Sequence, residues 1–254
     1  FYARHSHTII DSETCGIQHP ASEAVKNKVM ELVRKLNIPV YDEATGEGIL
    51  RHIITRVSFA TGDIMVILVV TDEKVPGLKK IINEISGKIP GVKSIVLNIN
   101  KRRDNVILGD TVKTIYGSDT IIDRLGHLTF NISPLSFFQV NPVQTVVLYN
   151  KAVEFAGLTG NETVFDLYCG TGTISLFLAE KAAEVIGVEV VPEAVKAAEK
   201  NARLNNIANT RFYCGEAEEV VPKLYEDGIK ADVVVVDPPR KGCDTKLLET
   251  MVKM

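Results

Sequence analysis

The sequence predicts an α/β protein in which a small α+β domain precedes a Rossmann-like domain of the doubly wound type. Between residues 163 and 236, four short apolar runs alternate with amphipathic segments, the pattern of a parallel sheet with helical crossovers. The first run leads into a loop with two glycines, which lets the backbone turn sharply at a strand end. Nearer the N-terminus, two extended runs follow one another as in a β-hairpin, with no helix between them. We therefore expect domains at residues 1–125 and 126–254.

The first domain is expected to combine two helices with a hairpin and further strands. Apolar residues recur at helical spacing from Ala21 to Leu36, and Pro39 ends that pattern. Two extended runs joined by Ala60-Thr61-Gly62 predict the hairpin. In chain order, the expected elements are a helix over 21–36, strands over 48–59 and 63–71, a helix over 78–89, a strand over 92–99, and mixed strand and turn over 106–123.

The second domain is expected to begin with a helix and continue as strand–helix units. The expected helices span residues 143–156, 173–181, 193–205, 217–225 and 246–254, and the strands span 163–167, 185–189, 211–214 and 231–236. Four strands are few for a doubly wound sheet, and its last helix normally leads into another strand. We therefore expect this fold to be C-terminally incomplete.

Composition excludes some classes of protein. Hydrophobic residues make up 45% of the chain, yet no apolar run approaches the roughly 20 residues of a membrane-spanning helix. The four cysteines, Cys15, Cys169, Cys214 and Cys243, are scattered and form no CxxC pair, which argues against a disulfide framework. The sequence thus predicts no membrane partner and a reducing cytoplasmic setting. We also expect a monomer.

Charge alone does not predict a nucleic-acid-binding protein. Up to residue 127 there are 17 Lys and Arg against 15 Asp and Glu, and after it 12 against 17. Any RNA-binding surface must therefore be a small basic patch within this chain or lie in another segment of the protein. Lys101-Arg102-Arg103 is the one short basic cluster that we weigh, and two readings stay open: a solvated turn, which we favour, or a contact to phosphate.

Three strand ends in the second domain bear residues suited to a ligand. The first is followed by Cys169-Gly170-Thr171-Gly172, but Ser175 interrupts a G-x-G-x-x-G motif, which weakens a dinucleotide reading. The second ends in Glu189, whose carboxylate can accept hydrogen bonds from both ribose hydroxyls. The third ends in Asp237-Pro238-Pro239, where two prolines fix the backbone beside the sheet edge. A helix-capping role for Glu189 and a plain strand-ending turn at Asp237 are the alternatives.

Together these motifs resemble the RNA uracil-5 methyltransferase family, whose bacterial members make 5-methyluridine in 23S ribosomal RNA and in transfer RNA. The resemblance spans essentially the whole chain, and its four motifs stand in the family's order: Phe137-Phe138-Gln139-Val140-Asn141, Asp166-Leu167-Tyr168-Cys169-Gly170-Thr171-Gly172, Gly187-Val188-Glu189 and Asp237-Pro238-Pro239-Arg240-Lys241-Gly242. It implies a Rossmann-like domain dependent on S-adenosylmethionine (SAM) and a first domain that contacts RNA, with 23S rRNA favoured over tRNA.

The resemblance also implies roles for single residues. Gln139 matches a family glutamine that contacts SAM, Tyr168 and Gly170 belong to the loop beside the cofactor, Glu189 matches the ribose-binding acid, and Asp237 matches a further SAM-site acid. Cys15 matches the fourth cysteine ligand of a 4Fe–4S cluster that many relatives bind through three more cysteines upstream. Those three are absent from this sequence, so the cluster is expected only in a full-length protein.

In the family, a cysteine thiolate attacks C6 of uracil, C5 takes the methyl group, and a late glutamate removes the C5 proton. The nucleophile stands in a Ser-Cys-(Asn/Asp)-Pro segment, which residues 1–254 do not contain. Cys169, Cys214 and Cys243 are better explained as packing residues. We therefore assign no catalytic residue and expect this chain to be an inactive fragment of the enzyme.

Other functions stay open. The main alternative is a non-catalytic module that binds SAM or RNA. Amino-group methylation of adenine or glutamine is disfavoured because Arg240 stands where those enzymes place an aromatic residue. A dehydrogenase using NAD is disfavoured by Gln139 and by the Asp-Pro-Pro-Arg strand end.

Overall fold

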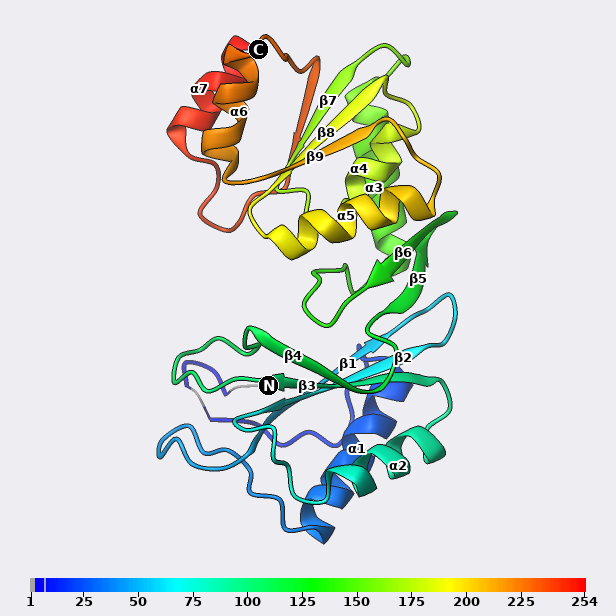
Figure 1. The fold of residues 1–254 in the computed structure, drawn as a ribbon, viewed down its shortest axis with the longest axis vertical. Helices are drawn as coiled ribbons and strands as arrows, with labels where there is room; N and C mark the ends of the chain where they lie inside the picture. Colours follow the sequence, from blue (N-terminus) through cyan, green and yellow to red (C-terminus); the bar gives the residue numbers. More distant parts are fainter. Residues whose placement is uncertain (1–2, 7) are drawn as a thin grey trace. The chain divides into compact units, whose positions relative to one another are not determined.

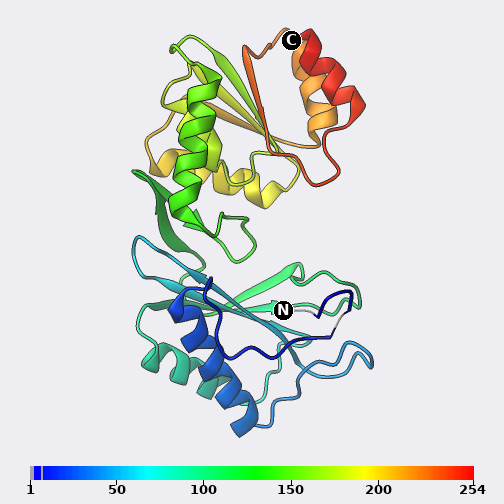
Figure 2. The same cartoon turned by 180° about the vertical axis from the view of Figure 1, so that it is seen from behind.

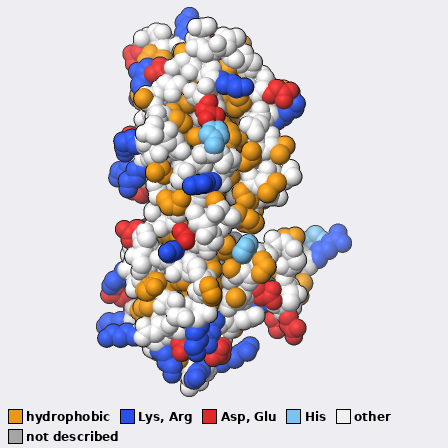
Figure 3. All heavy atoms as spheres, turned by 90° about the vertical axis from the view of Figure 1, so that its right-hand side faces the viewer, with side chains coloured by type: hydrophobic (Ala, Val, Ile, Leu, Met, Phe, Trp, Pro, Cys, Tyr) orange, Lys and Arg blue, Asp and Glu red, His pale blue; other side chains and the backbone are white. Residues whose placement is uncertain are grey.

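A computed structural model describes residues 3–6 and 8–254. The chain divides into two compact units, Phe1–Ile121 and Ile122–Met254 (Figures 1 and 2). Each has its own sheet and its own hydrophobic core. Acidic and basic side chains are both scattered over the face of the molecule in Figure 3. Among the described residues, no helix combines the length and the apolar character needed to cross a membrane.

The first unit is a four-stranded mixed sheet with two helices packed on one face (Figure 1). The strands lie in the order β1-β2-β3-β4, with β1/β2 and β3/β4 antiparallel and β2/β3 parallel. Its elements are α1 (Pro20–Lys35), β1 (Leu50–Val57), β2 (Ile64–Val70), α2 (Leu78–Lys88), β3 (Val92–Ile99) and β4 (Thr111–Gly117). The predicted hairpin over 48–71 is therefore confirmed as β1 and β2.

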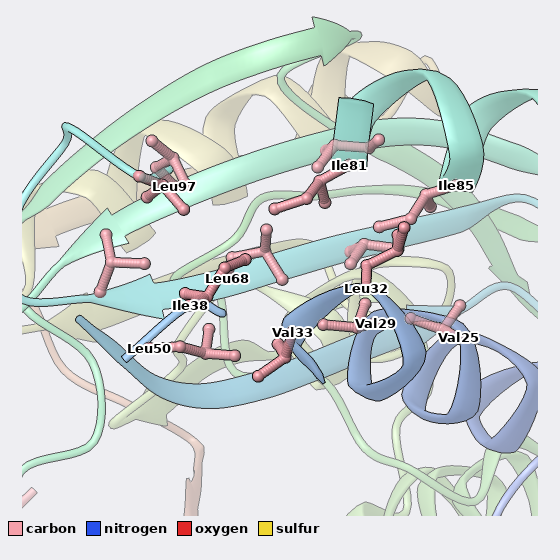
Figure 4. Packing of buried hydrophobic residues seen from close by; sticks show 14 of the residues in the cluster. Val25, Val29, Leu32, Val33, Ile38, Leu50, Leu68, Ile81, Ile85 and Leu97 are labelled. Carbon is pink, nitrogen blue, oxygen red and sulfur yellow. The ribbon is translucent and has the colours of Figure 1, made fainter. Parts of the chain in front are cut away.

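The core of this unit forms between the helices and alternate residues of the strands. Val25, Val29 and Leu32 of α1 and Ile85 of α2 are at most 1% exposed and pack toward Leu68 of β2 (Figure 4). Burying each such side chain contributes roughly 1.5–3 kcal/mol relative to exposing it. The helical spacing seen in the sequence thus marks the face that the sheet covers.

The second unit is a parallel sheet with helices on both faces. Its strands lie in the order β10-β7-β8-β9, and every neighbouring pair is parallel. One hydrophobic cluster joins α3, α4 and α5 to the sheet, and another joins α6 and α7 to its opposite face. The elements are α3 (Pro142–Ala156), β7 (Thr163–Leu167), α4 (Thr173–Ala179), β8 (Glu184–Glu189), α5 (Pro192–Leu204), β9 (Thr210–Cys214), α6 (Ala217–Glu226), β10 (Val233–Val236) and α7 (Thr245–Lys253).

The predicted Rossmann-like α/β arrangement is confirmed, and every predicted helix and strand of this unit forms within two residues of its expected bounds. The sequence did not resolve one element pair, β5 (Ile121–Leu125) and β6 (Leu128–Ile132), which form a separate two-stranded sheet. Gly126 lies in the left-handed region at φ 60°, so the chain can reverse within two residues. Asn205, which caps the C-terminus of α5 (Pro192–Leu204), neighbours this hairpin, accepting from the Thr129 N–H and donating to the Thr129 carbonyl.

Candidate functional site

The carboxyl ends of β7, β8 and β10 meet at one edge of the sheet. β7 lies between β10 and β8, and the chain goes from β7 to β8 on one side and reaches β10 on the other. Such a reversal of strand order opens a crevice outside the strand ends, where open α/β sheets bind ligands. The residues after Leu167, at Glu189 and after Val236 therefore face the same region.

The loop after β7 is held to the end of β8. The Cys169 N–H donates to the Val188 carbonyl at 3.1 Å, and the Gly170 N–H donates to Glu189 Oε2 at 3.0 Å. The other carboxylate oxygen of Glu189 accepts from the Val191 N–H at 2.9 Å. Gly170 and Gly172 have φ values of 55° and 77°, which an L residue adopts only with strain. Glu189 thus fixes the glycine loop and its own strand end together.

Gly187 lets this loop lie close to the sheet. A Cβ atom on Gly187 would stand 2.5 Å from Cδ1 of Phe212 and 2.9 Å from Sγ of Cys169. Both distances are shorter than real Cβ contacts, so a larger residue would displace the Phe212 ring or the loop. Close packing against Phe212 and Cys169 therefore explains why a glycine stands at position 187, two residues before Glu189.

Asp166, the fourth residue of β7, is a buried acid beneath the loop. Its side chain accepts a hydrogen bond from the Ser175 hydroxyl of α4 and is 1% exposed. Burial raises the pKa of Asp166 to about 7; the Ser175 hydroxyl opposes that shift, whereas the carboxylates of Asp237 and Glu189 add to it. The carboxylates of Asp237 and Glu189 therefore lie near enough to Asp166 to act on it electrostatically at this end of the sheet.

Asp237 extends the end of β10. Its N–H donates to the Leu167 carbonyl at 3.4 Å, and the residue is exposed. Tyr149 of α3 lies within electrostatic range of Asp166 and Asp237, and its hydroxyl hydrogen-bonds the Thr173 hydroxyl at 2.9 Å. Burial raises the pKa of Tyr149, so it is a neutral hydrogen-bonding group beside the two acids.

Tyr168 reaches across to α6. It has a left-handed backbone at φ 63°, and its hydroxyl donates to Glu218 Oε1 at 2.8 Å. Partial burial and this carboxylate raise the pKa of Tyr168, so the phenol is protonated at neutral pH. Four of the five residues predicted for the cofactor site, Tyr168, Gly170, Glu189 and Asp237, are thus gathered at one sheet edge.

Gln139 has a different setting. It lies three residues before α3 in a hollow whose other lining residues all belong to α3 or its cap, namely Asn141, Gln144, Thr145, Val147, Leu148 and Lys151. This hollow does not include the strand-end residues. A role for Gln139 in the same site therefore remains a prediction of the sequence resemblance.

The cysteines differ in their suitability as nucleophiles. Cys169 is buried, and burial raises its pKa well above the usual thiol value, which disfavours the thiolate. The Cys214 thiol donates weakly to the Val190 carbonyl at 3.8 Å. Cys15, in the first unit, is half-buried and free; Lys26 Nζ holds the preceding turn by donating to the carbonyls of Ser12 and Glu13. Among the described residues, no group of three or more His, Cys, Asp or Glu is placed to hold a metal ion.

Sequence reasoning missed three polar residues of this region: Asp166, Ser175 as its partner, and Glu218. An acid inside the apolar run of β7 was a usable signal, because a charged residue there must find a partner or a proton. Nothing in the sequence distinguished Glu218, because it is one of several acidic residues at the start of a helix, where acids are usually exposed.

Comparison with known proteins agrees with this geometry. Residues 158–251 match the family described as "Methyltransferase domain". The crystal structure of the Pyrococcus abyssi tRNA (uracil-54, C5)-methyltransferase in complex with S-adenosyl-L-homocysteine superposes with a TM-score of 0.80 at 28% identity, over 97% of this chain and 58% of that one. The second unit has the Rossmann-like fold of methyltransferases.

Curated relatives match along the whole chain. A protein of Clostridium tetani (strain Massachusetts / E88) named as an uncharacterised RNA methyltransferase is 53% identical over 254 residues, which is 100% of this chain and 55% of that protein. One from Halalkalibacterium halodurans with the same description is also 53% identical, over 100% of this chain and 56% of its own length. The chain thus spans little more than half the length of the curated relatives that it matches.

Proposed function

We propose that this chain provides the SAM-binding part and an RNA-contacting part of an RNA uridine C5-methyltransferase. The observation that supports it best is that Glu189 accepts backbone N–H groups of Gly170 and Val191 with its two carboxylate oxygens. It does so at the sheet edge where the strand order reverses between β10, β7 and β8. A carboxylate offers about four lone-pair positions. Two accept backbone N–H groups here, which leaves capacity for the two hydroxyls of a ribose. The residues present therefore fit the cofactor.

SAM supplies an electrophilic methyl group when bound. Glu189 would hold its ribose, Tyr168 and Gly170 would lie beside it, Asp237 would contribute a further acid, and Gln139 would contact it from the segment before α3. The chain's own groups already fix two of these: Glu189 by two backbone N–H donors, and Tyr168 by Glu218. Such preorganisation lowers the entropy lost on binding.

The choice of uridine C5 is supported by the four ordered motifs and by likeness to an enzyme named for that reaction on tRNA. The relatives named RNA methyltransferases support RNA as the substrate class. We propose 23S rRNA as the target and tRNA as the second choice, with the predicted first domain, residues 1–125, contacting the RNA. The scattered cysteines fit a cytoplasmic enzyme.

We further propose that residues 1–254 alone bind the cofactor but do not methylate RNA. None of the cysteines in the second unit lies in the family's nucleophile segment, and Cys169 is buried with a raised pKa. The matched relatives are much longer than this chain. The nucleophile and the base that removes the C5 proton are therefore assigned to residues outside this segment.

Isothermal titration with S-adenosylhomocysteine tests the cofactor site. Glu189→Ala should weaken binding by at least about tenfold, because the variant loses both the hydrogen bond that holds the glycine loop and the acceptor for the ribose hydroxyls. Glu184→Ala is the matched control, since Glu184 lies at the opposite end of the same strand and pairs with Arg211. Equal affinities in wild type and Glu189→Ala would rule out this assignment.

Tritium release from RNA labelled at uridine C5 tests the reaction. A full-length relative should release tritium from a 23S rRNA transcript faster than from tRNA, whereas residues 1–254 should release none. Turnover by this segment alone would show that one of its own residues is the nucleophile. If the full-length protein bound cofactor and RNA but released no tritium, the non-catalytic binding module would be the better description.

Cys15 is proposed as one of four thiolate ligands of a 4Fe–4S cluster in the longer protein. The residues of this chain do not complete that ligand set, because among the described residues no group of three or more His, Cys, Asp or Glu is placed to hold a metal ion. No step of the reaction is assigned to the cluster. Iron and sulfide analysis after anaerobic purification of a full-length protein should find about four of each per chain; finding neither would exclude the cluster.

A further inference from the structure

The end of β7 and the first turn of α6 are joined by one hydrogen bond between side chains. The Tyr168 hydroxyl donates to Glu218 Oε1 at 2.8 Å, although the two residues are 50 positions apart in the chain. Both residues are half-buried. The bond uses only groups of the protein itself, so the protein fixes the direction of the Tyr168 side chain.

The backbone of Tyr168 is strained in a way that such a bond helps to explain. Its φ of 63° is left-handed, a conformation that bulky L residues rarely adopt. The next two residues are tied down, Cys169 to the Val188 carbonyl and Gly170 to Glu189. Strained residues persist where neighbouring contacts determine them, and they concentrate at ligand sites.

The surroundings of Glu218 make it a fixed acceptor. It stands in the first turn of α6, where the helix dipole favours a negative charge. The Tyr168 side chain packs against the hydrophobic cluster beneath α6 and α7, which also contacts Cys243. The neighbouring acid, Glu219, is exposed and instead pairs with Lys246 of α7 at 2.9 Å.

We propose that Glu218 is a positioning residue of the cofactor site: by accepting the Tyr168 hydroxyl, it holds the aromatic ring in the orientation that the bound cofactor requires. This inference rests on the proposed function, in which Tyr168 lies beside the cofactor. Glu218 acts through Tyr168 and need not touch the ligand. A side chain ordered in advance loses less freedom when the ligand binds, so the effect belongs to affinity.

Titration of the 254-residue chain with S-adenosylhomocysteine tests the proposal. Glu218→Ala should weaken binding by about tenfold. Glu218→Gln should stay within about threefold of wild type, because its amide oxygen accepts the same hydrogen bond. Glu219→Ala, one residue away on the same turn, should bind as wild type does. A Glu218→Gln variant as weak as Glu218→Ala would contradict the proposal.

A double-mutant cycle separates positioning from a general loss of structure. Tyr168→Phe keeps the ring but removes the donor, so it should weaken binding as much as Glu218→Ala does. The double variant should be no weaker than either single variant. Additive losses would mean that Glu218 acts independently of Tyr168 and would overturn the proposal. Thermal unfolding of each variant shows whether a weak binder is still folded.

Binding of the cofactor and the role of Glu218 are tested separately by these variants. If the wild-type chain binds no S-adenosylhomocysteine, the proposed function itself fails. If the wild type binds and Glu189→Ala does not, while Glu218→Ala binds as wild type does, the cofactor site stands and only the role of Glu218 is wrong.

Discussion

Ser175 donates its hydroxyl hydrogen bond to Asp166 from the first turn of α4, and both residues are essentially excluded from solvent. This pair joins the strand before the glycine loop to the helix after it. Ser175 stands where a dinucleotide-binding fingerprint would place its third glycine, which normally allows close helix–strand packing. Here a serine at that position connects the helix to the strand through its hydrogen bond to Asp166. The loop is therefore anchored at both of its ends.

The first prediction concerns the pH dependence of stability. The pKa of Asp166 is raised from 3.8 to about 7 in the folded chain, so between these values the folded state binds more protons than the unfolded state. This contribution to stability is fully present below about pH 4 and is lost as pH rises toward and past 7, with a slope of at most about 1.4 kcal/mol per pH unit.

Asp166→Asn should remove that dependence, because the amide keeps the shape and cannot ionise. Urea unfolding of wild type and variant from pH 4.5 to 8 measures it. The stability of wild type relative to the variant should fall across that range. A difference that stays constant with pH would mean that Asp166 does not titrate there. Asp232→Asn, at an exposed position just before β10, serves as a control for a generic Asp-to-Asn effect.

The second prediction concerns the packing of the glycine loop. Gly187→Ala should destabilise the chain by about 1–3 kcal/mol, because the new Cβ meets Phe212 and Cys169 Sγ at less than 3 Å. Gly87→Ala in α2 is the opposite case: its Cβ meets nothing within 4 Å, and alanine favours helix, so the chain should gain about 0.5–1 kcal/mol. Chemical denaturation compares the two. A neutral Gly187→Ala would show that the loop yields easily.

The third prediction concerns the core of the first unit. Leu32→Ala should reduce the free energy of unfolding by about 2–5 kcal/mol, since Leu32 is 1% exposed within the cluster of Figure 4. Lys80→Ala, on the exposed face of α2, should change it by less than about 0.5 kcal/mol. Denaturant titration followed by circular dichroism measures both. Similar values for the two variants would place Leu32 outside the core.

The fourth prediction concerns the loop that presents the basic cluster. Buried Asn100 donates to the carbonyls of Val106 and Ile107 and accepts from the Arg102 N–H. Asn100→Ala should free this loop, so trypsin should cut after residues 101–103 at least about fivefold faster. Asn105→Ala, at an exposed loop position, is the matched control. Equal cleavage rates would show that other contacts hold the loop.

The same loop allows a test of the two readings of its charge. Arg102 pairs with Asp104 at 2.7 Å, which favours the solvated turn, whereas Lys101 and Arg103 are exposed. If the cluster contacts phosphate, Lys101→Ala should weaken RNA binding uniformly across sequences and reduce its salt dependence. If it is a solvated turn, filter-binding affinities should not change. Lys79→Ala, at an exposed position in α2, controls for the loss of one surface charge.

The order and kind of most elements were determined by the sequence. Helical spacing in 21–36 and alternation of apolar runs with helices after residue 163 are local patterns, and burial follows them directly. The glycines after β7 and the acid ending β8 also predicted a ligand-binding edge, because parallel strands bring their ends together. The hairpin of β5 and β6 was harder to predict, since it is short and lies between stronger patterns.

Tertiary structure alone decided which polar groups meet. It buried Asp166 and gave it Ser175 as a hydrogen-bond partner, paired Tyr168 with a carboxylate 50 residues away, and set Gln139 in a hollow along α3. Sequence periodicity records which face of an element is buried, but not which distant side chain it faces there. Those pairings depend on how helices seat on the sheet, and side chains only a few ångströms out of place do not hydrogen-bond.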